Sequence, residues 1–256
     1  MLGTIARASN VLELFVAGGE DWGVTEVATA LELPKSNAHE ILSSLAQAGL
    51  LQRSTSGRYR LGWRLLTLTG TLVRNQDLHR SSAPLLRGLC GSVSAVVAVA
   101  VWDGAHVVRM AQYGASTLGE LSTPLVGERL PVTTSAEGLM LLAHAEQRAA
   151  VAPVQDEAGT PDSVLDGRLE RIRSEGVAED VDGISVGLSS VAAPVWSAAG
   201  EVVAALSIVV PSRRYALERD ALRRSAGAAA ARLSLALRGA AAPVDRAAEL
   251  AEMRGA

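Results

Sequence analysis

The residues best suited to chemistry form a short polar and basic run around residue 36. The first turn of a predicted helix would hold Lys35, Ser36, Asn37 and His39. Free backbone N–H groups at such a turn also favour phosphate. Asparagine can bind adenine, lysine can reach guanine or a phosphate, and serine and histidine can do either. This spacing predicts a helix that enters the major groove of DNA.

Local charge favours the same interpretation. The chain has 24 Lys+Arg against 27 Asp+Glu, a formal charge of −3, so a bulk polycation that coats nucleic acid is excluded. Between residues 41 and 76, however, there is no acid, and the basic residues there are Arg53, Arg58, Arg60, Arg64 and Arg74. Alternation along a hairpin places Arg58 and Arg60 on one face, where they would meet phosphates or a minor groove.

Two observations oppose DNA binding. The exposed face of the same helix would continue through Glu40 and Ser43. A carboxylate in the groove repels phosphate, although Glu40 could accept from a cytosine amine or pair with a neighbouring basic side chain. The first 62 residues also hold six acids against five bases. A metabolite-sensing or protein-interaction module without DNA binding is therefore the alternative.

Three short helices and a hairpin would position these groups. An apolar stripe ends at Gly18-Gly19, a second helix is predicted over residues 25–31, and residues 50–61 resemble a hairpin. The third helix has apolar residues at helical spacing: Ala38, Ile41, Leu42 and Leu45. This order predicts a winged helix-turn-helix DNA-binding domain over residues 1–62.

The rest of the chain mixes strands with helices. Residues 63–80 predict one rigid helical connector, because no cluster of Pro or Gly interrupts them. Strands are predicted over residues 93–102, 107–113, 184–196 and 202–210, and helices over residues 135–148, 165–175 and 216–238. Hairpins dominate, so we expect a two-domain α+β protein with an antiparallel sheet in residues 81–240 and an Ala-rich tail at 241–256.

Signatures of catalysis and of metal binding are missing from the sequence. The four histidines lack metal-ligand spacing, the single cysteine excludes Cys-rich zinc modules, and no nucleophile elbow or phosphate-binding loop occurs. We expect no enzymatic activity, no metal and no cofactor. No apolar run approaches the ~20 residues that span a bilayer, and the N-terminus lacks a signal-peptide core, so we expect a cytoplasmic protein without membrane contact.

Several separated motifs, in sequence order, resemble the IclR (isocitrate lyase regulator) family of bacterial transcription regulators. They are Leu31–His39, Arg58–Gly62, Gly127–Val132, Ser135–Gly138, Gly187–Val195 and Val203–Ile208. The resemblance covers about residues 4–238. It implies a winged helix-turn-helix and a C-terminal effector domain similar to GAF/profilin-like folds. It also implies homodimers or dimers of dimers on palindromic or repeated operators, controlled by a small effector that is commonly an organic or aromatic acid.

The same resemblance implies a set of effector-binding positions. Carried over motif by motif, they are Leu130, Ala136, Glu137, Asp180, Leu188, Ser190, Ser207 and Val209, with walls from Met110, Leu118, Leu121 and Val132. We expect this pocket on the open side of the sheet, under the loop at residues 114–131, although its serines could be ordinary strand residues. The two carboxylates would weaken binding of an acid unless Arg109 or Arg129 neutralised them.

Three residues depart from the family pattern. Glu40 stands where an arginine is usual after the histidine, which bears on operator sequence and affinity. Leu139 replaces a usual lysine, and Gly183 replaces a usual acid. The last two predict a less charged or altered effector pocket.

Overall fold

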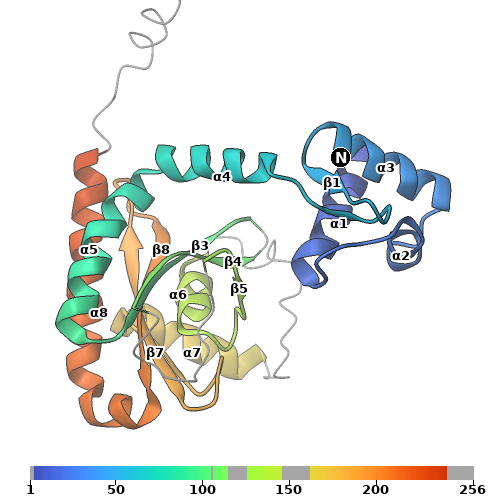
Figure 1. Cartoon of the computed structure of the whole chain (residues 1–256). Coiled ribbons are helices and arrows are strands. Elements are labelled where there is room, and N and C mark those ends of the chain that lie inside the picture. The colour runs from blue at the N-terminus through green and yellow to red at the C-terminus, as the bar shows by residue number, and fades with distance from the viewer. Residues whose placement is uncertain (1–2, 105, 115–125, 146–161, 241–256) are drawn as a thin grey trace, which may run out of the picture. The chain divides into compact units, whose positions relative to one another are not determined.

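The computed structural model describes residues 3–104, 106–114, 126–145 and 162–240 (Figure 1). The chain divides into two compact units, residues 1–75 and 76–256. Within the described ranges, no helix is long and apolar enough to cross a membrane.

The N-terminal unit is a helix-turn-helix with a two-stranded wing. Its elements are α1 (Gly3–Ala17), α2 (Val24–Ala30), α3 (Lys35–Gln47), β1 (Leu51–Arg53), β2 (Tyr59–Leu61) and α4 (Arg64–Asn75). The core joins Val11 and Phe15 of α1 to Val27 of α2, the apolar face of α3 and the Tyr59 ring. The two wing strands pair antiparallel. The predicted three helices and hairpin are therefore confirmed.

Backbone packing fixes the wing against the end of α3. Gly62 has no room for a side chain, because a Cβ there would lie 2.2 Å from the carbonyl oxygen of Gly49. Its N–H donates to the Leu50 carbonyl at 2.8 Å. The Arg64 guanidinium donates to the carbonyl of Ala48, one of the carbonyls left open where α3 ends. The wing is thus held close to the C-terminus of α3.

The prediction of one helix over residues 63–80 was wrong. α4 ends at Asn75, Gln76 is extended, and α5 (Asp77–Val93) begins a new helix with Asp77 in its first turn. The predicted strand start at Val93 was also wrong, since that residue ends α5. An apolar residue fits the buried side of a helix or a strand equally well, so hydrophobicity alone did not mark either boundary.

The C-terminal unit is built on a six-stranded sheet in the order β5-β4-β3-β8-β7-β6, with every neighbouring pair antiparallel. The strands are β3 (Val96–Trp102), β4 (Val107–Tyr113), β5 (Arg129–Leu130), β6 (Ala178–Val181), β7 (Leu188–Trp196) and β8 (Val202–Pro211). The expected antiparallel α+β domain is confirmed. The sequence did not predict β5 and β6, because they have only two and four residues.

Helices cover both faces of this sheet. α5 and α8 (Ser212–Ala240) pack against one face, and α6 (Ala136–His144) and α7 (Asp162–Glu175) against the other (Figure 1). Successive side chains of a strand point to opposite faces, so Leu206 and Ile208 of β8 pack toward α8 while Ser207 faces α6. The Ser207 hydroxyl of β8 therefore meets the start of α6.

Candidate DNA interface and effector hollow

The predicted polar face of α3 is partly exposed. Ala38, Leu42 and Leu45 are buried on the opposite side, as expected. The side chains of Lys35, Ser36, His39 and Glu40 are exposed, and those of Asn37 and Ser43 are half-buried. The Ser43 hydroxyl lies 3.5 Å from the Tyr59 hydroxyl, so part of its hydrogen-bonding capacity is used within the domain.

Glu40 lies on the flank of α3 that faces α1. It lines a shallow hollow together with Asn37 and Ser44 of α3 and with Thr4 and Arg7 of α1. The Glu40 carboxylate therefore lines the same hollow as the Arg7 side chain. Glu40 is therefore adjacent to the polar first turn of α3 but also belongs to a groove between two helices.

The wing arginines differ from one another in what they contact. Arg53 is exposed, with its guanidinium carbon 5.8 Å from the centroid of the Tyr59 ring, and Arg60 is exposed. Arg58 is instead paired with two acids: its Nε lies 2.6 Å from Asp21 and its Nη2 lies 2.7 Å from Glu26. The hydrogen bond from Arg58 is the main cause that lowers the pKa of the Glu26 carboxyl, and the N–H of Gly23 adds to it. Arg58 thus fastens the wing to the start of α2.

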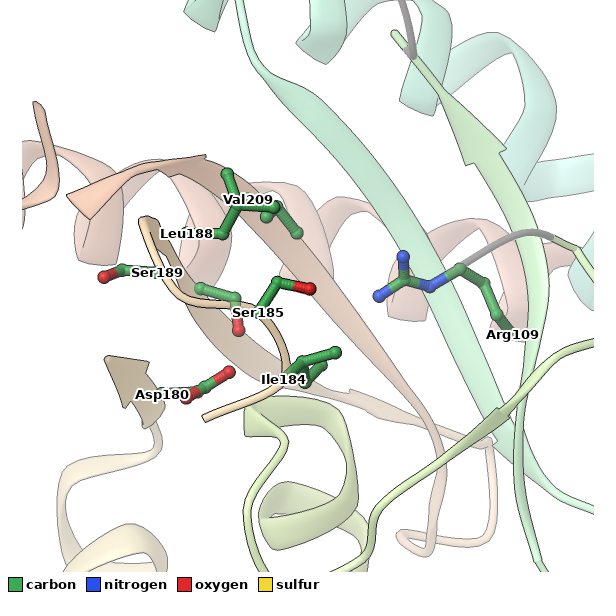
Figure 2. Close-up of a pocket in the computed structure, with 8 residues that line it drawn as sticks. Arg109, Asp180, Ile184, Ser185, Leu188, Ser189 and Val209 are labelled. Atoms are coloured by element: carbon green, nitrogen blue, oxygen red, sulfur yellow. The ribbon is translucent and has the colours of Figure 1, made fainter. Parts of the chain in front are cut away.

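The effector pocket was predicted on the open side of the sheet, which was wrong because helices cover both faces. A small hollow lies instead on the face that α6 covers (Figure 2). Its lining residues are Arg109, Asp180, Ile184, Ser185, Leu188, Ser189, Ser190 and Val209. The open space within it is about 10 Å³, which is room for about one water molecule. In Figure 2 the Arg109 guanidinium reaches from β4 toward the side chains of β6, β7 and β8.

Half of the predicted effector positions line this hollow, namely Asp180, Leu188, Ser190 and Val209. The others lie in its surroundings: Glu137 and Ser207 bond to each other, and Ala136 and Leu130 are buried in the core around α6. Of the predicted walls, Val132 packs near α6, whereas Met110 packs into the opposite core with α5 and α8, so its assignment as a wall was wrong. Leu118, Leu121 and most of the predicted covering loop lie outside the described residues.

A buried ion pair joins β4 to α6. Arg109 Nη2 lies 2.5 Å from Glu137 Oε1, and both side chains are completely buried. The Ser207 hydroxyl donates to the same oxygen at 2.7 Å, and Arg109 Nη1 donates to Gln112 at 3.0 Å. The suggested neutralisation of a pocket carboxylate by Arg109 is therefore confirmed. The sequence indicated that Arg109 would be buried, because residues two apart in a strand share one face and Val107 is an apolar residue of the same strand.

Asp180 is the second buried carboxylate. Its Oδ1 accepts a hydrogen bond from the Gly183 N–H at 2.6 Å. Burial is the main cause that raises the pKa of Asp180 to about 6, and the negative charge of Glu137 raises it further.

Two of the departures from the family pattern have structural explanations. A Cβ at Gly183 would lie 2.2 Å from Asp180 Oδ1 and 2.7 Å from the carbonyl of Thr134, so a glycine is needed there. Leu139 is completely buried in the core beneath α6. Both substitutions accompany a tightly packed α6 side of the sheet. No group of His, Cys, Asp and Glu within the described ranges could hold a metal ion.

Comparison with known proteins matches both units. The IclR helix-turn-helix domain matches residues 4–55, and the domain described as bacterial transcriptional regulator IclR C-terminal matches residues 70–235. Two relatives are from Escherichia coli (strain K12). HTH-type transcriptional regulator XynR is 28% identical over 214 residues (80% of this chain, 84% of the relative), and HTH-type transcriptional repressor AllR is 27% identical over 224 (84% and 82%). The crystal structure of an IclR homolog complexed with 4-hydroxybenzoate, from Microbacterium hydrocarbonoxydans, has a TM-score of 0.73 at 25% identity and covers 92% of this chain and 99% of that one.

Proposed function

The chain belongs to the IclR family of bacterial transcriptional regulators, which are not enzymes, and we propose that a small molecule in its C-terminal hollow controls its binding to a specific operator. Membership of the family shows that the chain binds DNA through its helix-turn-helix and that it has an effector domain. The operator contacts, the effector and the assembly are the proposal. The observation that supports it best is the polar first turn of α3, which is exposed opposite a buried apolar face.

We assign the base contacts to α3 and the flanking phosphate contacts to the wing. Lys35, Ser36 and His39 are exposed on the first turn, with Asn37 beside them and Ser43 further along the helix. The exposed Arg53 and Arg60 of the wing supply charge for phosphates. The sequence analysis also gave Arg58 and Glu40 a place in this surface. The two acids paired with Arg58 favour a structural role for it, and Glu40 faces α1.

A homodimer is the simplest assembly that reads a palindromic operator. Two recognition helices must reach successive major grooves about 34 Å apart. α4 and the residue before it present large apolar side chains to solvent: Trp63, Leu66, Leu68 and Leu72. An amphipathic helix with such a face is stable in water when another surface covers it. A second copy of the same helix is the partner that symmetry favours.

The effector would act through the α6 side of the sheet. The hollow has room for about one water molecule, so a larger molecule must displace its walls. A ligand then favours the arrangement in which the hollow is wider. It can shift DNA affinity only by the difference between its own affinities for the wider and the narrower arrangement. The 4-hydroxybenzoate complex of the Microbacterium homolog makes small aromatic molecules the first class to test in this chain.

Fluorescence anisotropy with DNA from upstream of the protein's own coding region tests the operator proposal. Lys35→Ala should weaken binding strongly, and Arg60→Ala should weaken it moderately and reduce its dependence on salt. Arg224→Ala, an exposed position of α8, is the matched control and should leave binding unchanged. Binding that is absent, or that does not depend on salt or on Lys35, would favour the interaction-module alternative.

Coupling between the two units is tested at α4. Replacing residues 64–75 by a Gly/Ser linker of equal length should keep effector binding, because α5 and the sheet are untouched. It should weaken operator binding, because the proposed dimer contact of α4 is lost. DNA that is still bound should no longer be released by the effector, because a flexible linker does not transmit a change of spacing. Release of DNA by the effector to the same extent as in the unaltered chain would contradict this coupling.

A further inference from the structure

An acid of the protein itself already occupies the position where the pocket could bind a carboxylate. A ligand acid at this face of the sheet would need Arg109, the buried cation of the hollow, and a hydroxyl such as that of Ser207. Glu137 Oε1 accepts hydrogen bonds from both, at 2.5 and 2.7 Å. Arg109 also donates to Gln112. Its charge is therefore compensated before any ligand arrives.

Buried polar atoms of both kinds lie near the hollow: the Nε–H donor of Arg109, and the acceptor groups of Glu137 and Ser190. Glu137 Oε2 is buried and, within the described part of the chain, has no hydrogen-bond partner. The same holds for the hydroxyl of Ser190, which lines the hollow and is 2% exposed. Buried polar atoms without partners cost free energy, so a ligand that supplied donors would be favoured. Asp180 adds a second carboxylate to the lining.

The charged residues around the hollow also favour a ligand that supplies hydrogen-bond donors. Glu137 and Asp180 are two acids, and Arg109 neutralises one of them. Arg168 of α7 acts on Asp180 from a distance, while its own Nη2 donates to the Glu179 carbonyl. Burial is the main cause that raises the pKa of Asp180 to about 6 and the charge of Glu137 adds to it, while the N–H groups of Gly183 and Ile184 and the charge of Arg168 lower it. Glu137 is thus paired with Arg109, whereas no ion pair to Asp180 occurs among the described residues.

We propose that Glu137 sets the specificity of the effector site, so that it selects small molecules with N–H donors, such as amidines, amines and amides, and disfavours carboxylates. This inference rests on the proposed function, in which the hollow is the effector site. The N–H groups of the ligand donate to Glu137, Asp180 and Ser190, and its apolar part packs on Ile184, Leu188 and Val209. A carboxylate would instead lie against two acids, and Arg109, the cation that lines the hollow, is already paired with one of them.

Three isosteric probes test this in the full-length protein without DNA. Benzamidine, benzamide and benzoate share one ring and one planar group, so the cost of widening the hollow is the same for all three. Thermal-shift titrations up to about 10 mM should rank their affinities benzamidine, then benzamide, then benzoate, with at least a tenfold gap between the first and the last. Absence of stabilisation by both nitrogen probes, or benzoate binding as tightly as benzamidine, overturns the proposal.

Glu137→Gln should reverse the preference. The glutamine keeps the size of the side chain but leaves the charge of Arg109 uncompensated, so benzoate should now stabilise the protein and benzamidine should bind at least about tenfold more weakly. If that variant does not fold, Asp180→Asn removes the other carboxylate and should weaken benzamidine by a similar factor. Glu201→Gln, an exposed position, is the control and should bind as the unaltered chain does.

The outcomes separate this inference from the proposed function. Tight binding of benzoate, with release of operator DNA, would leave regulation by an acid intact and refute the role given to Glu137. Selective binding of benzamidine in a protein that does not bind DNA would support the inference and refute the operator proposal.

Discussion

The buried pair of Arg109 and Glu137 allows a quantitative test of how the C-terminal unit is stabilised. The two charged atoms lie 2.5 Å apart and both side chains are completely buried. Replacing one partner leaves the other charge buried without its counter-ion, which costs about 3–5 kcal/mol. The hydroxyl of Ser207 and the amide of Gln112 would each still bond one of the partners, so we expect the lower end, about 3 kcal/mol. That is a large share of the roughly 5–15 kcal/mol that stabilises a typical domain.

Removing both charges should be far less harmful than removing either one. Arg109→Met and Glu137→Leu together replace the pair by apolar side chains within an apolar core, so the double variant should lie within about 1 kcal/mol of the unaltered protein or be more stable. The double-mutant cycle then yields a coupling energy of about 5 kcal/mol, above the roughly 0.5–3 kcal/mol that is usual for contacting residues.

Native-state amide hydrogen exchange measures these values for the C-terminal unit separately from the winged domain. In each single variant, the slowest amides of β3 and β8 should exchange more than about 100-fold faster, the factor for 3 kcal/mol. Exchange in the double variant should return close to that of the unaltered protein. If each single variant costs less than about 1 kcal/mol and the two effects simply add, then water reaches the pair and the argument from burial fails.

Three further predictions concern the wing and the loop beside the hollow. Arg60→Ala should reduce the salt slope of operator binding by about 0.9, a 3.5-fold smaller loss of affinity between about 50 and 200 mM salt, whereas Arg58→Ala should leave the slope unchanged because its charge is paired with two acids. Burial raises the pKa of Asp180 from its ordinary 3.8 to about 6. The contribution of Asp180 to the free energy of unfolding is therefore greatest below pH 3.8 and is lost as the pH rises through 6. In urea unfolding at about pH 4.5 and 7.5, Asp180→Asn should remove this loss. Gly183→Ala should destabilise the protein in thermal unfolding, since the new Cβ would lie 2.2 Å from an oxygen, whereas Gly167→Ala in α7, with open space around it, should stabilise by about 0.5–1 kcal/mol.

The sequence predicted the elements whose burial follows a regular period. Ala38, Leu42 and Leu45 recur at helical spacing, and the structure buries all three on one face of α3. The break at Gln76 was not predictable in this way, because the residues on both sides have helical patterns and the extended backbone of Gln76 alone separates the two helices. β6 escaped prediction because it is a short edge strand that contains two acids, Glu179 and Asp180.

The site was harder to predict than the fold, because contacts distant in the sequence determine which charges are available. Arg58 and Arg60 are two residues apart in the wing and look equivalent, but only the former meets Asp21 and Glu26, which lie 37 and 32 positions away. Arg109 and Glu137 are 28 positions apart and neutralise each other in the core. In each case an arginine that would suit an anion, a phosphate or a carboxylate, is already bound by an acid of the same chain.

This pairing has opposite consequences in the two units. In the winged domain it pairs Arg58 with two acids, while Lys35, Arg53 and Arg60 stay exposed. In the effector domain it pairs the buried Arg109 of the hollow with Glu137, while Glu137 Oε2 and the Ser190 hydroxyl have no hydrogen-bond partner among the described residues. The family's fold is kept in both units, while the chemistry that each surface can recognise is set by a few acids. Operator affinity and effector class should therefore change when these acids are replaced, even where the fold does not.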